Sequence, residues 1–156
     1  MAEVADGLYE ADLLAWTEAQ AALLRRAGAL RLNSIPGLDW ENLAEEIETL
    51  GKSRVRELSS RYKVILLHLL KWRYQASLRT PSWRFTIRDQ RDEVEEVLAE
   101  SPSLRGRRRA ELDRAYPKAR KGAAEETGLP LQVFPADCPF TLEQVEDEAF
   151  LPEPDA

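Results

Sequence analysis

The chain has 156 residues, of which 44% are hydrophobic and 32% charged, and its formal net charge is −6. These values predict a globular domain and exclude a disordered chain, and no stretch approaches the roughly 20 apolar residues that cross a bilayer. A single cysteine, Cys138, excludes an internal disulfide framework and, with no secretory signal visible at the N-terminus, predicts a cytoplasmic protein.

Two helices are predicted in the N-terminal third of the chain. Apolar residues at spacings of three and four predict a first helix over Leu8–Ala27, with Asp6 as its N-cap. A turn is expected over residues 33–37, where a proline adjoins a glycine. Asp39 then begins a second helix, and Gly51 is expected to end it with a kink or a short turn.

A long helix is predicted over Lys52–Tyr74 at the centre of the chain. Its residues 61–72 are apolar on every side, which is typical of a buried helix, and they include His68, the only histidine. We therefore expect His68 to lie in the interior. The pair Thr80-Pro81 predicts the start of the next helix, which should end at Ser101-Pro102.

The C-terminal third is expected to hold a helix, an extended segment and a short last helix. The helix should span Pro102–Glu126 with a kink or a split at Pro117, which lacks an amide hydrogen. Its inward face is expected to consist of Leu112, Ala115, Tyr116, Ala119 and Ala123. The extended, proline-rich segment is Gly128–Pro139, and Thr141 with a glutamine three residues on predicts a capping box for the last helix. The side chains expected to anchor the extended segment are Leu129, Val133 and Phe134. Those expected to dock the last helix on the core are Leu142, Val145 and Phe150.

The predicted fold class is all-α, because no segment shows the alternating pattern of a strand. We expect a single-domain bundle of about five or six helices over residues 1–156, with a buried central helix. Its core should cover about residues 6–127, followed by the extended segment and last helix at 128–150 and an acidic tail at 151–156.

The charges divide along the chain. Residues 1–50 have 3 basic and 10 acidic side chains, residues 51–121 have 19 and 9, and residues 122–156 have none and 9, which gives net charges of −7, +10 and −9. A basic centre can face a nucleic acid. We favour the alternative that the acidic ends neutralise it within the chain, because opposite charges in one small domain pair readily.

Two blocks of the sequence are distinctive, Asp39-Trp40-Glu41-Asn42-Leu43 and His68-Leu69-Leu70-Lys71-Trp72. Together with shorter blocks such as Ser82-Trp83 and Cys138-Pro139, they resemble the bacterial family catalogued as domain of unknown function 29 over nearly the whole chain. The resemblance implies a compact helical domain, and it implies no established activity, cofactor or site residues.

Arg61 and His68 are seven residues apart, so they lie near one line along a helix. The spacing resembles the motif of helical ribonucleases of the higher-eukaryote and prokaryote nucleotide-binding type, in which an arginine precedes a histidine after a short spacer. There the imidazole would move a proton and the guanidinium would bind the phosphate. This spacing is common by chance, and the flanking leucines favour burial instead.

The favoured interpretation of His68 is structural: a core imidazole that donates to a carboxylate or a backbone carbonyl, with Glu46 as the preferred acid. A buried charge needs a partner, and the same holds for the cations nearby, Lys71 included. The predicted polar belt across two helices consists of Asp39, Asn42 and Glu46 against Arg54, Arg61 and His68.

A metal site is a weaker alternative. Glu45 and Glu46 with His68 supply the ligand types of bundle sites, but those sites need two Glu-x-x-His pairs and the chain has one histidine. We therefore expect no metal and no cofactor, and the remaining alternative is a carboxylate-only magnesium site of Asp39, Glu45 and Glu46. Cys138 has no basic neighbour that would lower its pKa, so it is predicted to be a buried, unreactive thiol.

Cations alternate with aromatic residues after the central helix, a pattern that can follow a phosphate backbone or cover packed tryptophans. The candidate nucleic-acid contacts are Arg79, Arg84, Arg88, Arg91 and Trp83.

No complete catalytic set is present, so we expect a helical protein-interaction or scaffold domain that works without catalysis. It would bind a partner protein or a second copy of itself, using the aromatic residues Trp40, Trp83 and Phe85. The alternative is a metal-independent ribonuclease or RNA-binding domain that uses Arg61 and His68.

Overall fold

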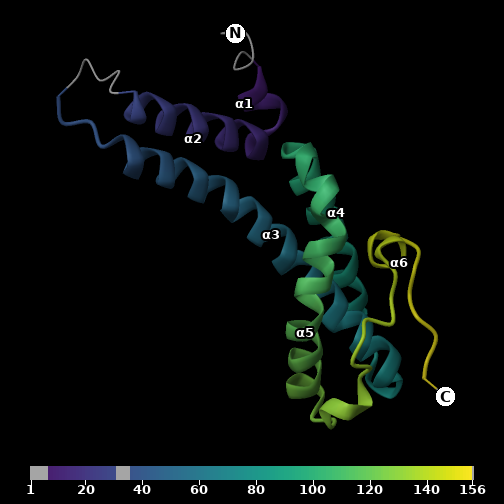
Figure 1. Cartoon of the computed structure of the whole chain (residues 1–156). Coiled ribbons are helices and arrows are strands. Elements are labelled where there is room, and N and C mark those ends of the chain that lie inside the picture. The colour runs from purple at the N-terminus through teal and green to yellow at the C-terminus, as the bar shows by residue number, and fades with distance from the viewer. Residues whose placement is uncertain (1–6, 31–35, 156) are drawn as a thin grey trace. The chain divides into compact units, whose positions relative to one another are not determined.

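The computed structural model describes residues 7–30 and 36–155, and every regular element in these ranges is a helix (Figure 1). The all-α prediction is confirmed. The α-helices are α1 (Leu8–Ala11), α2 (Leu13–Ala29), α3 (Trp40–Tyr74), α4 (Pro81–Glu100), α5 (Arg108–Thr127) and α6 (Leu142–Glu146). The 3₁₀ turns are η1 (Ala76–Leu78), η2 (Pro102–Arg107) and η3 (Leu131–Val133). None of these helices is both long enough and apolar enough to span a membrane.

The described residues divide into two compact units. The first contains the residues up to Arg56 together with Leu98–Arg105, and the second contains Glu57–Val97 and the residues from Gly106 onward. The division falls within α3 and α4, so that each of these helices contributes to both units. The two units are described separately below.

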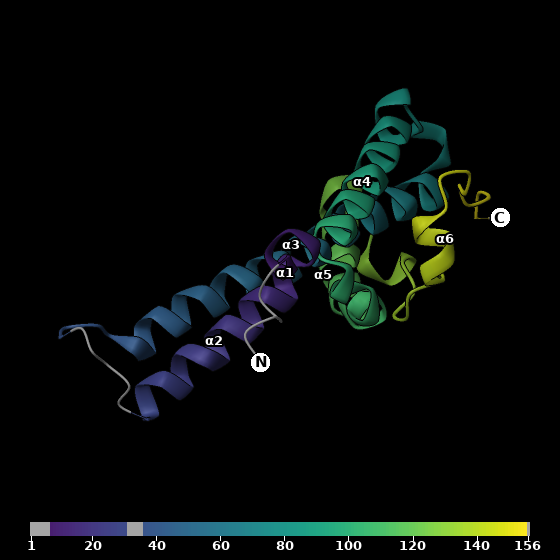
Figure 2. The ribbon, with the colours of Figure 1, turned by 90° about the horizontal axis from the view of Figure 1, so that it is seen from above.

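In the first unit, α2 and the N-terminal part of α3 form an antiparallel hairpin, visible in both Figure 1 and Figure 2. Small residues line the seam: Ala21 and Ala44 are buried, and a Cβ added to Gly51 would overlap the Thr17 hydroxyl. The predicted break at Gly51 is therefore wrong, because α3 continues through it without interruption. This glycine permits close approach of two helices rather than a turn.

The start of α2 is fixed by Asp12. Its carboxylate accepts from the Ala15 amide at 2.9 Å and from the amide and hydroxyl of Ser103 at 2.6 and 2.9 Å, which ties η2 to α2. Asp12 is in extended backbone, so the predicted helix Leu8–Ala27 is divided into α1 and α2 there. The predicted N-cap, Asp6, lies outside the described residues. The Ser101 hydroxyl accepts from the Leu14 amide at 3.3 Å in the same region.

The core of the second unit is built around the C-terminal part of α3, which confirms the buried central helix. Tyr62, Ile65, Leu66, Leu69 and Leu70 are fully buried there. The face of α5 that was predicted to point inward is also buried. That face consists of Leu112, Ala115, Tyr116, Ala119 and Ala123.

The C-terminal half differs from the prediction in three places. The expected helix start at Pro102 is a 3₁₀ turn, and α5 begins only at Arg108. α5 then runs through Pro117, whose side chain is exposed, without the expected split. In the extended segment Phe134 is buried as predicted, whereas Val133 is 40% exposed. The capping box at Thr141 is confirmed.

Candidate functional site: an arginine-lined cleft

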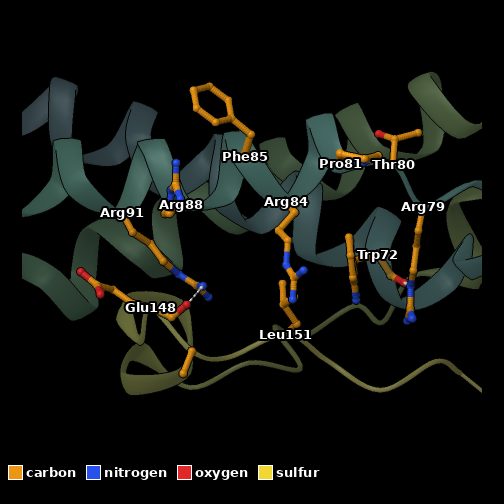
Figure 3. Close-up of a pocket in the computed structure, with 11 residues that line it drawn as sticks. Trp72, Arg79, Thr80, Pro81, Arg84, Phe85, Arg88, Arg91, Glu148 and Leu151 are labelled. Atoms are coloured by element: carbon orange, nitrogen blue, oxygen red, sulfur yellow. Dashed lines mark hydrogen bonds between the residues drawn. The ribbon is translucent and has the colours of Figure 1, made fainter.

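A cleft of about 700 Å³ opens in the second unit, and four arginines are among its lining residues (Figure 3). One wall is α4 with the end of α3 and the segment that joins them, and the other wall is the chain that follows α6. The lining residues are Trp72, Arg79, Thr80, Pro81, Arg84, Phe85, Arg88, Arg91, Glu148, Ala149 and Leu151.

The cleft contains all four arginines that the sequence singled out. Arg84, Arg88 and Arg91 follow spacings of four and three on α4, which places them on one face of the helix. Thr80 fixes the start of that helix, since its hydroxyl accepts from the Trp83 amide at 3.3 Å. Trp83 itself does not line the cleft.

The ring of Trp83 is already covered by a cation. The Lys71 ammonium lies 4.3 Å from the ring centroid and pairs with Glu126 at 2.8 Å. Lys71 is therefore a buried cation with an acidic partner, as its burial requires.

None of the four guanidiniums forms an ion pair with an acid in the described ranges, and three of them also lack the set of backbone partners that Arg91 has. Arg84 and Arg88 are exposed and form no ion pair with any residue in the described ranges; Arg88 lies 5.7 Å from the Phe85 ring centroid. Arg79 donates to the Trp72 carbonyl at 2.8 Å and covers the Trp72 ring at 4.7 Å. Its Nη2 is buried, with no hydrogen-bond partner among the described residues.

The fourth arginine, Arg91, holds the second wall in place. It is only 3% exposed and donates to the backbone carbonyls of Val145, Gln144 and Glu148 at 2.8, 3.1 and 3.5 Å; Figure 3 draws the bond to Glu148. Burial lowers the pKa of this guanidinium from its usual value. Its interactions are with main-chain atoms of the segment after the start of α6, which leaves the other arginines to face the cleft.

A second anchor fixes the same segment. Glu146 accepts from the Tyr62 hydroxyl at 2.5 Å and pairs with Arg108 at 3.0 Å. Burial and the nearby Glu146 carboxylate raise the pKa of Tyr62, so the phenol remains a hydrogen-bond donor. The wall that includes Leu151 is therefore attached to both α3 and α5 in addition to α4.

The second wall was not anticipated from the sequence. Glu148, Ala149 and Leu151 come from a stretch predicted as the end of the last helix and an acidic tail. In Figure 3, Arg84 extends from α4 toward Leu151, whereas Phe85 points away from it. The only available signal was Val145, whose predicted docking on the core is confirmed by its complete burial.

The predicted polar belt is not formed, because α3 is one continuous helix rather than two that pack together. The acids bound by its arginines lie elsewhere: Arg54 pairs with Glu100 at 3.1 Å, and Arg61 pairs with Glu93 at 3.1 Å and Glu57 at 3.4 Å. Among the acidic and amide residues of the predicted belt, the Asn42 side-chain amide donates to the Asp39 carboxylate at 2.6 Å.

Glu45 and Glu46, the weak metal candidates, are both exposed on α3. Across the described ranges, no three His, Cys, Asp or Glu side chains come together in a group that suits a metal ion.

His68 is half-buried, which corrects the expectation of a fully interior ring. Its Nδ1 donates to the Val64 carbonyl at 2.9 Å, so its partner is a backbone carbonyl and not Glu46. Burial lowers the pKa of His68, and the Lys71 ammonium lowers it further. Neither His68 nor Arg61 lines the cleft.

We expect the free energy of unfolding to fall as the pH drops below about 6.5, the pKa of an unperturbed histidine. The pKa of His68 is lower in the folded than in the unfolded state, so folding favours the neutral imidazole. This contribution to stability is fully present above the unfolded-state pKa, and it is lost as the pH falls through the folded-state pKa. Urea unfolding at several pH values measures this, and in His68→Gln this part of the pH dependence should vanish. An NMR titration of the single imidazole that gave a pKa of about 6.5 or higher would contradict the prediction.

Cys138 is half-buried, and its thiol donates to the Phe140 carbonyl at 3.4 Å. Burial raises the pKa of this thiol, so the protonated form dominates at neutral pH. This agrees with an unreactive cysteine, although its burial is less complete than predicted.

Comparisons with known proteins agree on the fold and give no activity. A crystal structure of an α-helical protein of unknown function from Rhodospirillum rubrum is similar, with a TM-score of 0.69 and 28% sequence identity over 91% of this chain and 90% of that one. No curated protein matches. The family model described as domain of unknown function DUF29 matches residues 8–151.

Proposed function

The chain belongs to the family of the domain of unknown function DUF29, and because membership supplies no activity, we propose a function from the cleft itself. We propose that the protein is a cytoplasmic interaction domain whose arginine-lined cleft binds an acidic segment of a partner protein. The observation that supports this most strongly is the group of three guanidiniums, on Arg79, Arg84 and Arg88, that no acid in the described ranges neutralises.

The chemistry of the cleft suits a peptide that is both acidic and apolar. Arginine binds carboxylates in a two-pronged geometry, and exposed arginines at a surface raise the rate at which an anionic partner associates. The opposite wall adds apolar contacts from Ala149 and Leu151. A volume of about 700 Å³ accommodates a few side chains of such a segment.

A nucleic acid fits these features less well. Single strands bind by stacking bases on free aromatic rings, but the rings of Trp72 and Trp83 already have a cation over them. Among the lining aromatics, Phe85 alone is strongly exposed, at 57%.

The ribonuclease alternative has less support still. Its general base would have to be His68, whose Nδ1 is bonded to the Val64 carbonyl, and its phosphate ligand would have to be Arg61. The Arg61 guanidinium is engaged by Glu57 and Glu93, so an incoming phosphate would compete with two carboxylates.

We expect a short fluorescein-labelled peptide of alternating glutamate and leucine to bind the full chain, as measured by fluorescence anisotropy. The affinity should fall as salt is added, because Arg84 and Arg88 are exposed and salt screens exposed charges. The double variant Arg84→Glu/Arg88→Glu should weaken binding by about tenfold or more, equivalent to roughly 1.4 kcal/mol.

Two controls define the test. Lys118→Glu makes a charge reversal at an exposed position of α5, outside the cleft, and should leave the affinity unchanged. A labelled oligouridine tests the nucleic-acid alternative. Tighter binding of the RNA than of the peptide, lost in the double arginine variant, would overturn the proposal in favour of RNA binding. Peptide binding that ignores the arginine changes would also reject it.

A further inference from the structure

The cleft has an excess of positive charge that its own acid does not balance. Its lining residues include four arginines and a single carboxylate, that of Glu148. This carboxylate forms no ion pair within the described ranges, and in Figure 3 it points away from Arg84. Arg91 is engaged by backbone carbonyls. The guanidiniums of Arg79, Arg84 and Arg88 therefore leave three positive charges for a ligand to meet.

The charges of α4 are arranged against the usual preference of a helix. A helix favours acids in its first turn and cations in its last turn, because its peptide dipoles leave a partial positive charge at the N-terminal end. In α4 no acid lies in the first turn and no cation lies in the last turn. Arg84 lies instead at the end of the first turn, where its guanidinium adds to the positive potential. An anion bound to this arginine would compensate both charges.

Arg84 and Arg88 are placed to bind one anion together. They are one turn apart on α4, and side chains four residues apart on a helix have Cβ atoms about 5–6 Å from each other. Both are exposed and without an ion pair in the described ranges, so a bound anion displaces no acid from them. A guanidinium presents its donors in a flat fork, which matches two oxygens of a carboxylate or a phosphoryl group.

We propose that the acidic segment bound by the cleft is phosphorylated on a serine or threonine that has an apolar neighbour. This inference rests on the proposed function, because it names the anion within that segment. A phosphoryl group carries a charge of about −1.5 to −2 at neutral pH and has three strong acceptor oxygens. A carboxylate carries a single charge and has two oxygens. One phosphoryl group therefore satisfies the guanidiniums of Arg84 and Arg88 together better than one glutamate does.

The walls of the cleft favour a segment of a protein over a free phosphate ion. A volume of about 700 Å³ is much larger than one phosphoryl group needs. The lining includes the apolar side chains of Ala149 and Leu151, which a free ion would not use. In Figure 3 Arg84 extends toward Leu151, so the charged and the apolar contacts are adjacent. A phosphorylated residue followed by a leucine fits this arrangement.

Fluorescence anisotropy on the full chain with three matched peptides tests the inference. The peptides share the alternating glutamate–leucine sequence, and the central glutamate is kept, replaced by phosphoserine or replaced by serine. We expect the phosphoserine peptide to bind about tenfold more tightly than the glutamate peptide, and the serine peptide to bind most weakly. The preference should shrink as the pH falls from about 7.5 to about 5.5, because the second pKa of phosphoserine is about 6 and the pKa of glutamate is about 4.3.

The variant Arg84→Lys/Arg88→Lys separates recognition by guanidiniums from simple attraction between charges. Lysine retains the positive charge but lacks the planar fork of arginine. We expect this variant to weaken the phosphoserine peptide more than the glutamate peptide, so that the ratio of the two affinities falls toward one. The control is Lys118→Arg, the reciprocal change at an exposed position of α5 outside the cleft, which should leave the ratio as in the wild type.

The outcomes separate this inference from the proposed function. Equal affinity for the phosphoserine and glutamate peptides overturns the phosphoryl assignment and leaves the binding of acidic segments intact, whereas failure of all three peptides to bind rejects both. A preference that survives in Arg84→Lys/Arg88→Lys overturns the assignment as well, because the guanidiniums then do not recognise the group. Inorganic phosphate that displaces the phosphoserine peptide at micromolar concentration assigns the cleft to a free anion and also overturns it.

Discussion

We expect Arg91→Leu to lower the free energy of unfolding by about 3 kcal/mol, because three backbone carbonyls, one of them in a buried hydrogen bond, lose a charged donor at once. The side chain is 3% exposed and donates to Gln144, Val145 and Glu148. Urea unfolding followed by circular dichroism measures the change. Hydrogen exchange should show the amides of residues 144–151 losing protection before the rest of the second unit.

Arg88→Leu is the matched control on the same helix. Arg88 is exposed and without an ion pair in the described ranges, so its removal should change stability by less than about 0.5 kcal/mol. The two variants should therefore differ in kind: Arg91→Leu removes the wall of the cleft, whereas Arg88→Leu removes a charge from it. Equal effects on stability would show that Arg91 does not hold the C-terminal segment.

The second large effect is expected at Gly51 in the first unit. Gly51→Leu should lower the free energy of unfolding by about 3 kcal/mol, since a side chain there must displace Thr17 and separate α2 from α3. Leucine is a better helix former than glycine by up to about 1 kcal/mol, so local propensity alone predicts stabilisation. Urea unfolding distinguishes the two effects, because helix packing predicts a lower free energy of unfolding for Gly51→Leu and helix propensity predicts a higher one.

Gly106→Leu provides the control, because a Cβ at Gly106 meets no atom within 4 Å. Its stability should stay within about 0.5 kcal/mol of the wild type. A further variant, Gly51→Ala/Thr17→Ala, should be more stable than Gly51→Ala alone, because it removes the overlapping hydroxyl. If Gly51→Leu were as stable as Gly106→Leu, the close approach of the two helices would be refuted.

The elements predicted correctly are those whose signals are local. The N-cap at Thr80 and the capping box at Thr141 depend on side chains that bond amides two or three residues away, so the sequence alone suffices. The inward face of α5 follows from periodicity in the same way. These features need no knowledge of what packs against them.

The errors arise where the same local signal has two physical meanings. A glycine such as Gly51 can end a helix or admit a neighbouring helix, and only the position of Thr17 in space decides between them. His68 is surrounded by leucines in sequence, yet Val64 and Trp72, one turn away on either side, are also only half-buried. These three residues form a line along α3 that is only partly buried, although the surrounding sequence is apolar.

Of the two walls of the candidate site, only the arginines of the α4 wall were identified from the sequence. Helical spacing puts Arg84, Arg88 and Arg91 on one face of α4, and the sequence had singled out all three, as candidate nucleic-acid contacts. The opposite wall comes from residues 148–151, about 60 positions later in the chain. It is attached to Arg91 through backbone carbonyls, which every residue type has, so no residue of that segment signals the contact in the sequence. Long-range contacts of this kind are beyond a single sequence.

Arg91 recognises main-chain oxygens, which every residue type possesses. Residues 148, 149 and 151 can consequently be substituted during evolution without loss of the hydrogen bonds that hold their segment in place. Members of one lineage could thus acquire different ligand preferences by point substitutions at these three positions, while the scaffold that presents them stays the same. Deep mutational scanning should therefore find these positions tolerant for folding and selective for binding, and Arg91 intolerant for both.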